Sequence, residues 1–212
     1  MKRTRVKICG ITRREDAELA ETLGADAIGF VFVPRSKRHV APSTAAEISR
    51  ELGPMVQRVG LFLDAEAAHV AAALDRLPGL LPQFHGRETA AFCESFGVPY
   101  IKALGGRSGW PDSDEIAAYA GASAFLLDSH EPGELGGTGQ VFDWSGMPVV
   151  RPRYMILAGG LHAGNVGKAI ADIAPHAVDV SSGVETSPGV KCRRKLGAFF
   201  DAVRSADSTR CS

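Results

Sequence analysis

Cys9 ends the short apolar segment Val6–Cys9 and is followed at once by Gly10. The carboxyl ends of parallel strands carry the reactive side chains of α/β proteins, and a thiol there can act as a base or a nucleophile. A free cysteine is also among the most often buried residue types, so Cys9 considered alone could equally belong to the core. Lys7 points to the same side of an extended strand as Cys9, which suggests that its ammonium group stabilises a thiolate.

Other polar side chains stand where predicted strands end. Gln83 and His85 alternate along one segment and therefore face the same way, although a single histidine is more often a hydrogen-bonded structural group than a base. Asp128 and Asp179 each close a strand and could orient a neighbour rather than act as an acid. Asp143 could be a catalytic acid or the N-cap of the next helix, and its spacing leaves both interpretations open.

Paired small residues follow the last two predicted strands, namely Gly159 and Gly160, then Ser181, Ser182 and Gly183. Small residues allow backbone N–H groups to approach a phosphate closely, and the loops after the seventh and eighth strands of a barrel are those that commonly bind one. The glycine pair could also make only a tight turn. Because both loops share this composition, the sequence favours a phosphate site.

An unusually long loop, Ser129–Phe142, follows the sixth predicted strand; it is rich in glycine and includes Gly139. A loop of this length in a compact domain is usually functional, and its composition suits a segment that closes over a ligand and excludes water. A basic cluster of Arg35, Lys37 and Arg38 follows the second predicted strand. Such a run is often a solvated surface, but its place at a strand end makes it a candidate anion site.

These candidate site residues can act together only in a fold that brings the carboxyl ends of the strands close to one another. Short apolar segments alternate with segments whose apolar residues recur every three or four positions, which predicts alternating strands and helices. Eight such units imply an α/β fold, a single-domain (β/α)8 TIM barrel over residues 1–204 with a disordered tail over 205–212. The predicted strands are Val6–Cys9, Ala27–Phe32, Arg58–Leu63, Leu80–His85, Tyr100–Leu104, Ala124–Asp128, Tyr154–Ala158 and Ala177–Ser181. The predicted helices include Arg14–Leu23, Ala65–Arg76, Glu88–Phe96, Asp114–Tyr119 and Ala163–Ile173.

An open, doubly wound sheet is the alternative architecture. It would carry a GxGxxG fingerprint after the first strand, where this chain reads Cys-Gly-Ile-Thr, so the barrel is favoured. Two local details carry their own predictions. Pro82 lacks a backbone donor, which predicts a bulge or a late start for the fourth strand. Thr12 stands three residues before Glu15, which predicts an N-cap for the first helix.

The composition limits the class of partner. The 212 residues include 24 basic and 24 acidic side chains, so no net charge recruits nucleic acid or an anionic membrane. No apolar run approaches the roughly 20 residues of a membrane span, and the basic start is not followed by a secretory signal. The four cysteines show no ligand spacing, so we expect a cytoplasmic protein with reduced thiols and no metal site.

In these residues the chain resembles the phosphoribosylanthranilate isomerase family of tryptophan biosynthesis. The resemblance covers nearly the whole chain and depends on the order and spacing of several stretches rather than on any one of them. The matching stretches are Val6-Lys7-Ile8-Cys9-Gly10-Ile11, Gly24-Ala25-Asp26, Gly29-Phe30-Val31-Phe32, Pro34-x-Ser36-x-Arg38-x-Val40, Gln83-x-His85-Gly86, Gly136-Gly137-Thr138-Gly139, Phe142-Asp143-Trp144, Gly159-Gly160-Leu161, Val178 to Glu185 and Pro188-Gly189-Val190-Lys191.

The resemblance implies an enzyme that opens the ribose of N-(5'-phosphoribosyl)anthranilate and forms an aminoketose by an Amadori rearrangement, with no metal or cofactor. Carried over by motif, Cys9 is the general base, Asp143 is the general acid, and Arg38 holds the anthranilate carboxylate. The glycine pair after the seventh strand and the Ser-Ser-Gly run after the eighth hold the phosphate. The remaining residues expected to contact the substrate are Gln83, His85, Gly139 and Asp179. The enzyme is expected to be a monomer or a homodimer.

Few positions depart from the family pattern. Phe84 replaces the usual leucine, Pro82 an apolar strand residue, and Cys192 a common aspartate. The nearest alternative is the sister isomerase of histidine biosynthesis, or an enzyme with both specificities. That enzyme would carry an aspartate in place of Cys9 and a second phosphate site after the third and fourth strands, where Leu63-Asp64 offers no paired glycines. An alternative of another class is a non-catalytic barrel that binds a phosphosugar.

Overall fold

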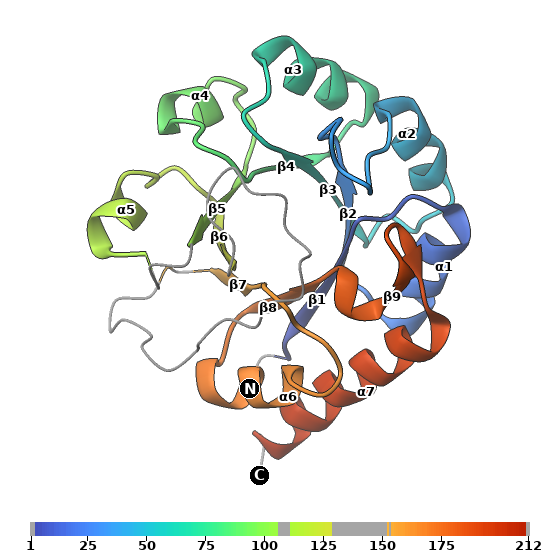
Figure 1. Cartoon of the computed structure of the whole chain (residues 1–212). Coiled ribbons are helices and arrows are strands. Elements are labelled where there is room, and N and C mark those ends of the chain that lie inside the picture. Colours follow the sequence, from blue (N-terminus) through green and yellow to red (C-terminus); the bar gives the residue numbers. More distant parts are fainter. Residues whose placement is uncertain (1–2, 106–110, 129–151, 153, 211–212) are drawn as a thin grey trace.

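A computed structural model describes residues 3–105, 111–128, 152 and 154–210 of the chain. Eight parallel strands close into a barrel in the order β1 to β8, which confirms the predicted fold class (Figure 1). The strands are β1 (Arg5–Cys9), β2 (Ala27–Val31), β3 (Gln57–Phe62), β4 (Leu81–Phe84), β5 (Ile101–Gly105), β6 (Ala124–Asp128), β7 (Met155–Leu157) and β8 (Ala177–Val180). Every predicted strand is present, and each end lies within one residue of its prediction.

Helices surround the barrel, as the alternating pattern predicts (Figure 1). They are α1 (Arg14–Leu23), α2 (Pro42–Arg50), α3 (Ala67–Arg76), α4 (Ala90–Glu94), α5 (Ser113–Ala117), α6 (Val166–Ile173) and α7 (Arg193–Thr209). After β8 the chain forms the short 3-10 helix η1 (Ser182–Val184) and an antiparallel pair, β9 (Glu185–Ser187) and β10 (Val190–Lys191). None of the described helices has the length and apolar character needed to cross a bilayer.

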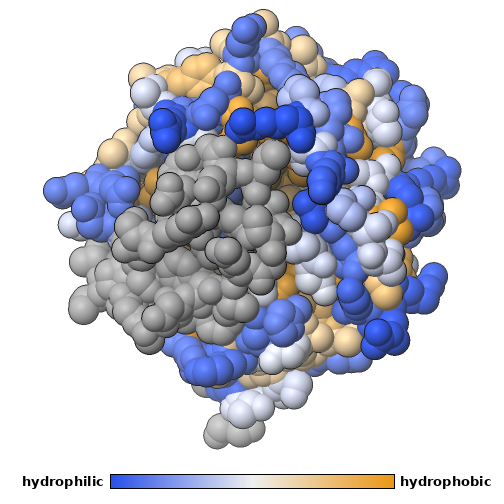
Figure 2. Space-filling model, in the orientation of Figure 1, coloured by the Kyte–Doolittle hydropathy of each residue, from blue (hydrophilic) through white to orange (hydrophobic). Residues whose placement is uncertain are grey.

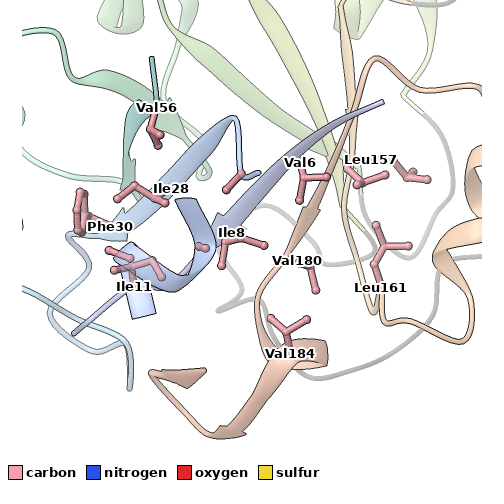
Figure 3. Close-up of a cluster of buried hydrophobic side chains, with 14 of the residues drawn as sticks. Val6, Ile8, Ile11, Ile28, Phe30, Val56, Leu157, Leu161, Val180 and Val184 are labelled. Atoms are coloured by element: carbon pink, nitrogen blue, oxygen red, sulfur yellow. The ribbon is translucent and has the colours of Figure 1, made fainter. Parts of the chain in front are cut away.

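Side-chain alternation divides each strand between two environments. Val6 and Ile8 of β1 point outward and pack with Ile28 of β2 and Val180 of β8 in the layer between barrel and helices (Figure 3). A separate apolar cluster fills the inside of the barrel, formed by Val59, Ile101, Ala103, Leu126, Ile156 and Ala158. The side chains between the outward-facing ones, such as Cys9, therefore face the barrel interior, where one end of the barrel can carry chemistry.

Pro82 causes no bulge, because it lies where no donor is needed. The register between β3 and β4 runs without a shift from Val59↔Leu81 to Phe62↔Phe84. The backbone N–H of His85 donates to Phe62 O of β3, so by alternation the nitrogen of Pro82 faces β5. Pairing with β5 begins only at Gln83, one residue after the proline. Of the two predicted alternatives, a bulge or a late start, the structure shows the late start.

The predicted cap of α1 is wrong. The N-cap residue is Arg13, and no side chain caps this helix. The hydroxyl of Thr12 instead donates to Gly189 O at 2.5 Å, which ties the start of the first helix to the turn between β9 and β10. A tertiary contact therefore takes the group that the local pattern assigns to the cap.

The disordered tail predicted from residue 205 is also wrong as far as Thr209, because α7 continues to that residue. Its apolar face packs on the barrel through Leu196, Phe199, Phe200 and Val203. The last turns are then fixed by Asp207, whose carboxylate accepts hydrogen bonds from Thr4 N at 2.8 Å and Thr4 Oγ1 at 2.7 Å. Cys211 and Ser212 lie outside the described residues.

Candidate active site

The described residues predicted to form the site lie at or toward the carboxyl end of the barrel, except that Lys7 stands in the middle of β1 and also lines a cavity at the opposite end. Cys9 ends β1, Arg38 lies in the segment after β2, and His85 follows β4 directly. The two glycines at 159 and 160 follow β7, and the Ser-Ser-Gly run at 181–183 follows β8. Gly139 and Asp143 lie outside the described residues. Figure 2, drawn in the orientation of Figure 1, shows that the described surface around this end of the barrel mixes hydrophilic side chains with smaller hydrophobic areas.

Cys9 is buried, with 6% of its surface exposed, in a small apolar cluster with Val31 and Val33. Burial raises the pKa of its thiol above the ordinary value, and this effect outweighs the opposing attraction of the Lys7 ammonium group. The neighbouring carboxylate of Asp179 raises the pKa as well, whereas Lys191 lowers it. In the absence of substrate the protonated thiol is therefore favoured.

Lys7 reaches the thiol, but it shares its charge with a carboxylate. Its Nζ lies 2.9 Å from Asp179 Oδ1, and both side chains are almost fully buried. Burial alone would lower the pKa of Lys7, but the attraction of Asp179 and then of Cys9 raises it above the ordinary value. Lys7 thus acts on Cys9 in the predicted direction, and Asp179 weakens that action.

His85 is held as a neutral ring. Gln83 Nε2 lies 3.0 Å from His85 Nδ1, and His85 Nε2 lies 3.6 Å from Asp128 Oδ2. Burial lowers the pKa of His85, and this effect outweighs the opposing attraction of Asp128. The side-chain oxygen of Gln83 is buried and has no hydrogen-bond partner among the described residues. This pair therefore offers polar groups to a bound molecule rather than a strong base.

A cavity of about 40 Å³ lies between the ends of β7 and β8. It is lined by Asp128, Ala158, Gly159, Gly160, Leu161, Asp179, Val180, Ser181 and Ser182. The hydroxyl of Ser181 is buried on the side of Gly10, where a Cβ would stand 3.0 Å from it, and has no hydrogen-bond partner within the described part of the chain. Gly183 makes this close packing possible, since a Cβ at that position would stand 2.0 Å from Leu161 O. A small cavity walled by a glycine pair and by serines at two strand ends suits an anion with several acceptor oxygens.

Arg38 is already engaged by an acidic partner that the sequence did not reveal. Its Nε lies 2.9 Å from Glu185 Oε1 and its Nη2 lies 2.7 Å from Glu185 Oε2. Lys191 contacts the same carboxylate, with Nζ 2.8 Å from Oε1. Glu185 and Lys191 both belong to motifs that match the family, and this match was the signal in the sequence that could have marked them as site residues. The alternation of side chains along a strand could not have predicted these contacts, because Arg38 and its two neighbours, Glu185 and Lys191, come from separate segments of the chain.

A larger cavity, of about 590 Å³, opens at the opposite end of the barrel, and Arg3, Arg5, Met55 and Gln57 are among its lining residues. Of the predicted site residues only Lys7 reaches it, so volume alone does not identify the site. Within the described ranges, no three His, Cys, Asp or Glu side chains are arranged to hold a metal ion.

Comparison with known proteins shows the family of this chain. The family model for N-(5'phosphoribosyl)anthranilate (PRA) isomerase matches residues 6–202. The N-(5'-phosphoribosyl)anthranilate isomerase of Azotobacter vinelandii is 51% identical over 206 residues, covering 97% of this chain and all of the relative.

Solved structures give the same relationship. The phosphoribosyl anthranilate isomerase of Thermus thermophilus superposes with a TM-score of 0.85 at 42% identity, covering 95% of this chain and 99% of that one. A second solved isomerase, in complex with reduced 1-(o-carboxyphenylamino)-1-deoxyribulose 5-phosphate, has a TM-score of 0.80 at 37% identity and covers 95% of this chain and 99% of its own. This chain belongs to the N-(5'-phosphoribosyl)anthranilate isomerase family.

Proposed function

We propose that this chain converts N-(5'-phosphoribosyl)anthranilate to 1-(2-carboxyphenylamino)-1-deoxyribulose 5-phosphate in tryptophan biosynthesis. The observation that carries the proposal is the pairing of two features at one end of the barrel. A buried thiol, Cys9, ends β1, and a cavity walled by Gly159, Gly160 and the serines after β8 lies at the end of the adjacent strand β8. The thiol can move a proton at the sugar, and the cavity suits the phosphate of the same molecule.

The reaction needs one proton given and one taken. Asp143, as the acid, protonates the furanose ring oxygen while the bond from that oxygen to C1' breaks, and the nitrogen lone pair forms a Schiff base. The thiolate of Cys9 then removes the proton from C2', and the electron pair of that bond moves to give an enolamine. Tautomerisation of the enolamine yields the ketone. Each proton transfer of this kind typically contributes 10²–10⁴-fold to the rate.

Lys7 and Asp179 should tune the Cys9 thiol in opposite directions. Lys7→Met should raise the pKa of Cys9 further, because the ammonium group that favours the thiolate is lost, and Asp179→Asn should lower it. Ultraviolet titration of the thiolate, with the Cys9→Ala protein as a blank, measures both. Breaking this buried pair costs about 3–5 kcal/mol in either variant, so opposite shifts in the two cannot come from unfolding. An unchanged thiol pKa in Lys7→Met contradicts the assignment.

Arg38 is proposed to hold the anthranilate carboxylate. Arg38→Met should raise KM about tenfold or more and change kcat little, because a carboxylate clamp acts on the ground state and the transition state alike. Steady-state kinetics measures the split between the two constants. A fall in kcat at unchanged KM would instead assign Arg38 to the chemical step.

The loops after β3 and β4 argue against the substrate of histidine biosynthesis, which carries a second phosphate. Backbone N–H groups there already have carboxylate partners. Glu88 accepts from Asp64 N and Gly86 N, each at 2.9 Å, and Asp64 accepts from Arg87 N at 2.6 Å. A phosphate would have to displace these carboxylates and would be repelled by them. The described residues therefore favour a substrate with one phosphate.

The test of the proposed function is the loss of anthranilate-substrate fluorescence when the purified protein is added. Cys9→Ala serves as the inactive control, and the aminoimidazole ribotide of histidine biosynthesis is assayed in parallel. Turnover of the ribotide at a similar rate would favour the dual-specificity alternative. Tight binding of both without turnover would favour the non-catalytic barrel.

The proposal also includes the location of the enzyme in the cell and its oligomeric state. Cys9, Cys93 and Cys192 are free thiols, which supports a cytoplasmic location. We propose that the enzyme acts as a monomer or a homodimer.

A further inference from the structure

A hairpin lies beside the catalytic end of β1. It consists of β9 and β10, in which Lys191 pairs with Glu185, and it lies between η1 and α7 in the chain (Figure 1). Three contacts fix it against the first β/α unit or α7: Thr12 Oγ1 donates to Gly189 O, Lys191 N donates to Asp16 Oδ2 at 3.0 Å, and Lys195 Nζ donates to Glu185 O at 2.6 Å. The proposed mechanism uses no residue of this hairpin.

Lys191 connects the hairpin to the residue that acts as the base. Its Nζ donates to Cys9 O at 2.5 Å, to Glu185 Oε1 at 2.8 Å and to Ser181 O at 3.4 Å. The side chain is completely buried. An ammonium group has three protons, so these three acceptors satisfy it. Lys191 therefore fixes the distance between the Glu185 carboxylate and the backbone at the ends of β1 and β8.

Glu185 in turn fixes Arg38. The carboxylate binds the Nε–Nη2 edge of the guanidinium, so Nη1 and the second proton of Nη2 form the remaining edge, which can still bind a second carboxylate. The methylene stem of Arg38 lies close to Gly10: a Cβ on residue 10 would stand only 2.5 Å from Arg38 Cδ. The guanidinium of Arg38 is thus held by Glu185, and its methylene stem is held against Gly10, the residue that follows Cys9.

The charges of this cluster also suit a carboxylate. Burial would raise the pKa of Glu185, but the hydrogen bond from Arg38 and the charge of Lys191 lower it below the ordinary value. Two cations and one anion leave one net positive charge, which an anionic ligand neutralises. A buried ion network is seldom more stabilising than apolar residues of the same size, so stability alone does not account for it.

We propose that Glu185 and Lys191 are positioning residues of this isomerase. Glu185 presents the free edge of Arg38 to the substrate carboxylate, and Lys191 couples that clamp to the backbone of Cys9, so that the clamp and the base keep one spacing. The inference rests on the proposed function, in which Arg38 holds the carboxylate and Cys9 is the base.

The first test uses two substrates in steady-state kinetics, the phosphoribosyl derivatives of anthranilate and of aniline, which lacks the carboxyl group. Glu185→Gln should raise KM for the anthranilate compound about tenfold and change KM for the aniline compound less than twofold. In an Arg38→Met background the same substitution should have almost no further effect. An equal rise for both substrates, or an effect that adds fully to that of Arg38→Met, overturns the role of Glu185.

The second test concerns Lys191. Lys191→Met should lower kcat and slow alkylation of Cys9 by iodoacetamide several-fold at pH 7.5, followed by mass spectrometry of the Cys9 peptide. The charged groups facing Cys9 are Lys7, Asp179, Lys191 and Arg38, and only one of them changes. Lys195→Met is the matched control, since it removes a hairpin contact outside the ion network and should leave both rates near wild type. Unchanged alkylation and kcat in Lys191→Met overturn its role.

Partial unfolding cannot imitate these results. KM does not depend on the fraction of folded enzyme, whereas apparent kcat does, and thermal unfolding gives that fraction for each variant. Failure of the proposed function has a different signature: the wild-type protein would not convert the anthranilate compound, or would show the same KM for both substrates.

Discussion

Replacing Cys9 with alanine should lower kcat by about 10³-fold while the protein stays folded. In the proposed reaction the thiolate is the group that removes the C2' proton, and loss of a positioned base typically costs 10²–10⁴-fold. The fold should survive because only a sulfur atom is lost from a small apolar cluster at the end of β1. Continuous fluorescence assays give kcat, and thermal unfolding reports on stability.

Cys93→Ala is the matched control for that experiment. Cys93 is also buried, but it lies on α4 outside the barrel, where burial raises the pKa of its thiol to about 12. Its loss should leave kcat near wild type. Because the pKa of Cys9 is raised as well, kcat/KM of the wild type should increase as the pH rises above neutral, since more thiolate forms. A Cys9→Ala protein that keeps more than a tenth of wild-type kcat would refute the base assignment.

Replacing Asp143 with asparagine should also lower kcat about 10³-fold, because the amide cannot give the ring oxygen a proton. Asp143 is the proposed acid because the Phe142-Asp143-Trp144 motif matches the family, and the described carboxylates at the carboxyl end of the barrel have other partners. Asp179 is paired with Lys7 Nζ at 2.9 Å, and Asp128 lies 3.6 Å from His85 Nε2. KM should change little, since the acid acts during bond breaking.

Asp128→Asn distinguishes the two candidate acids. It removes one carboxylate from the end of β6 and should cost less than tenfold in kcat, because Asp128 orients His85 in the proposed site. Single-turnover measurements separate ring opening from product release for both variants. If Asp128→Asn abolishes turnover while Asp143→Asn does not, the general acid is Asp128, and the assignment of that role to Asp143 is wrong.

The positions of the strands could be predicted to within one residue because each strand of a parallel barrel is a short apolar segment between polar turns. The same alternation predicts that Lys7 and Cys9 share a face. Pro82 shows the limit of such reasoning. A missing donor matters only if a neighbouring strand pairs at that residue, and the start of β5 at Ile101 decides this.

By itself, the sequence determined the barrel, the strand ends that gather at its mouth and the residue types presented there, including Cys9, Arg38 and the small residues after β7 and β8. Only the tertiary structure decided the partners of those residues. Lys7 pairs with Asp179 across 172 positions, Arg38 with Glu185 across 147, and Lys191 reaches the Cys9 carbonyl across 182. Periodicity reports which face a side chain occupies, because that depends on local backbone geometry. Which charges come together depends on closure of the barrel, and these contacts modify the pKa of Cys9, which burial raises most, and fix the direction of Arg38.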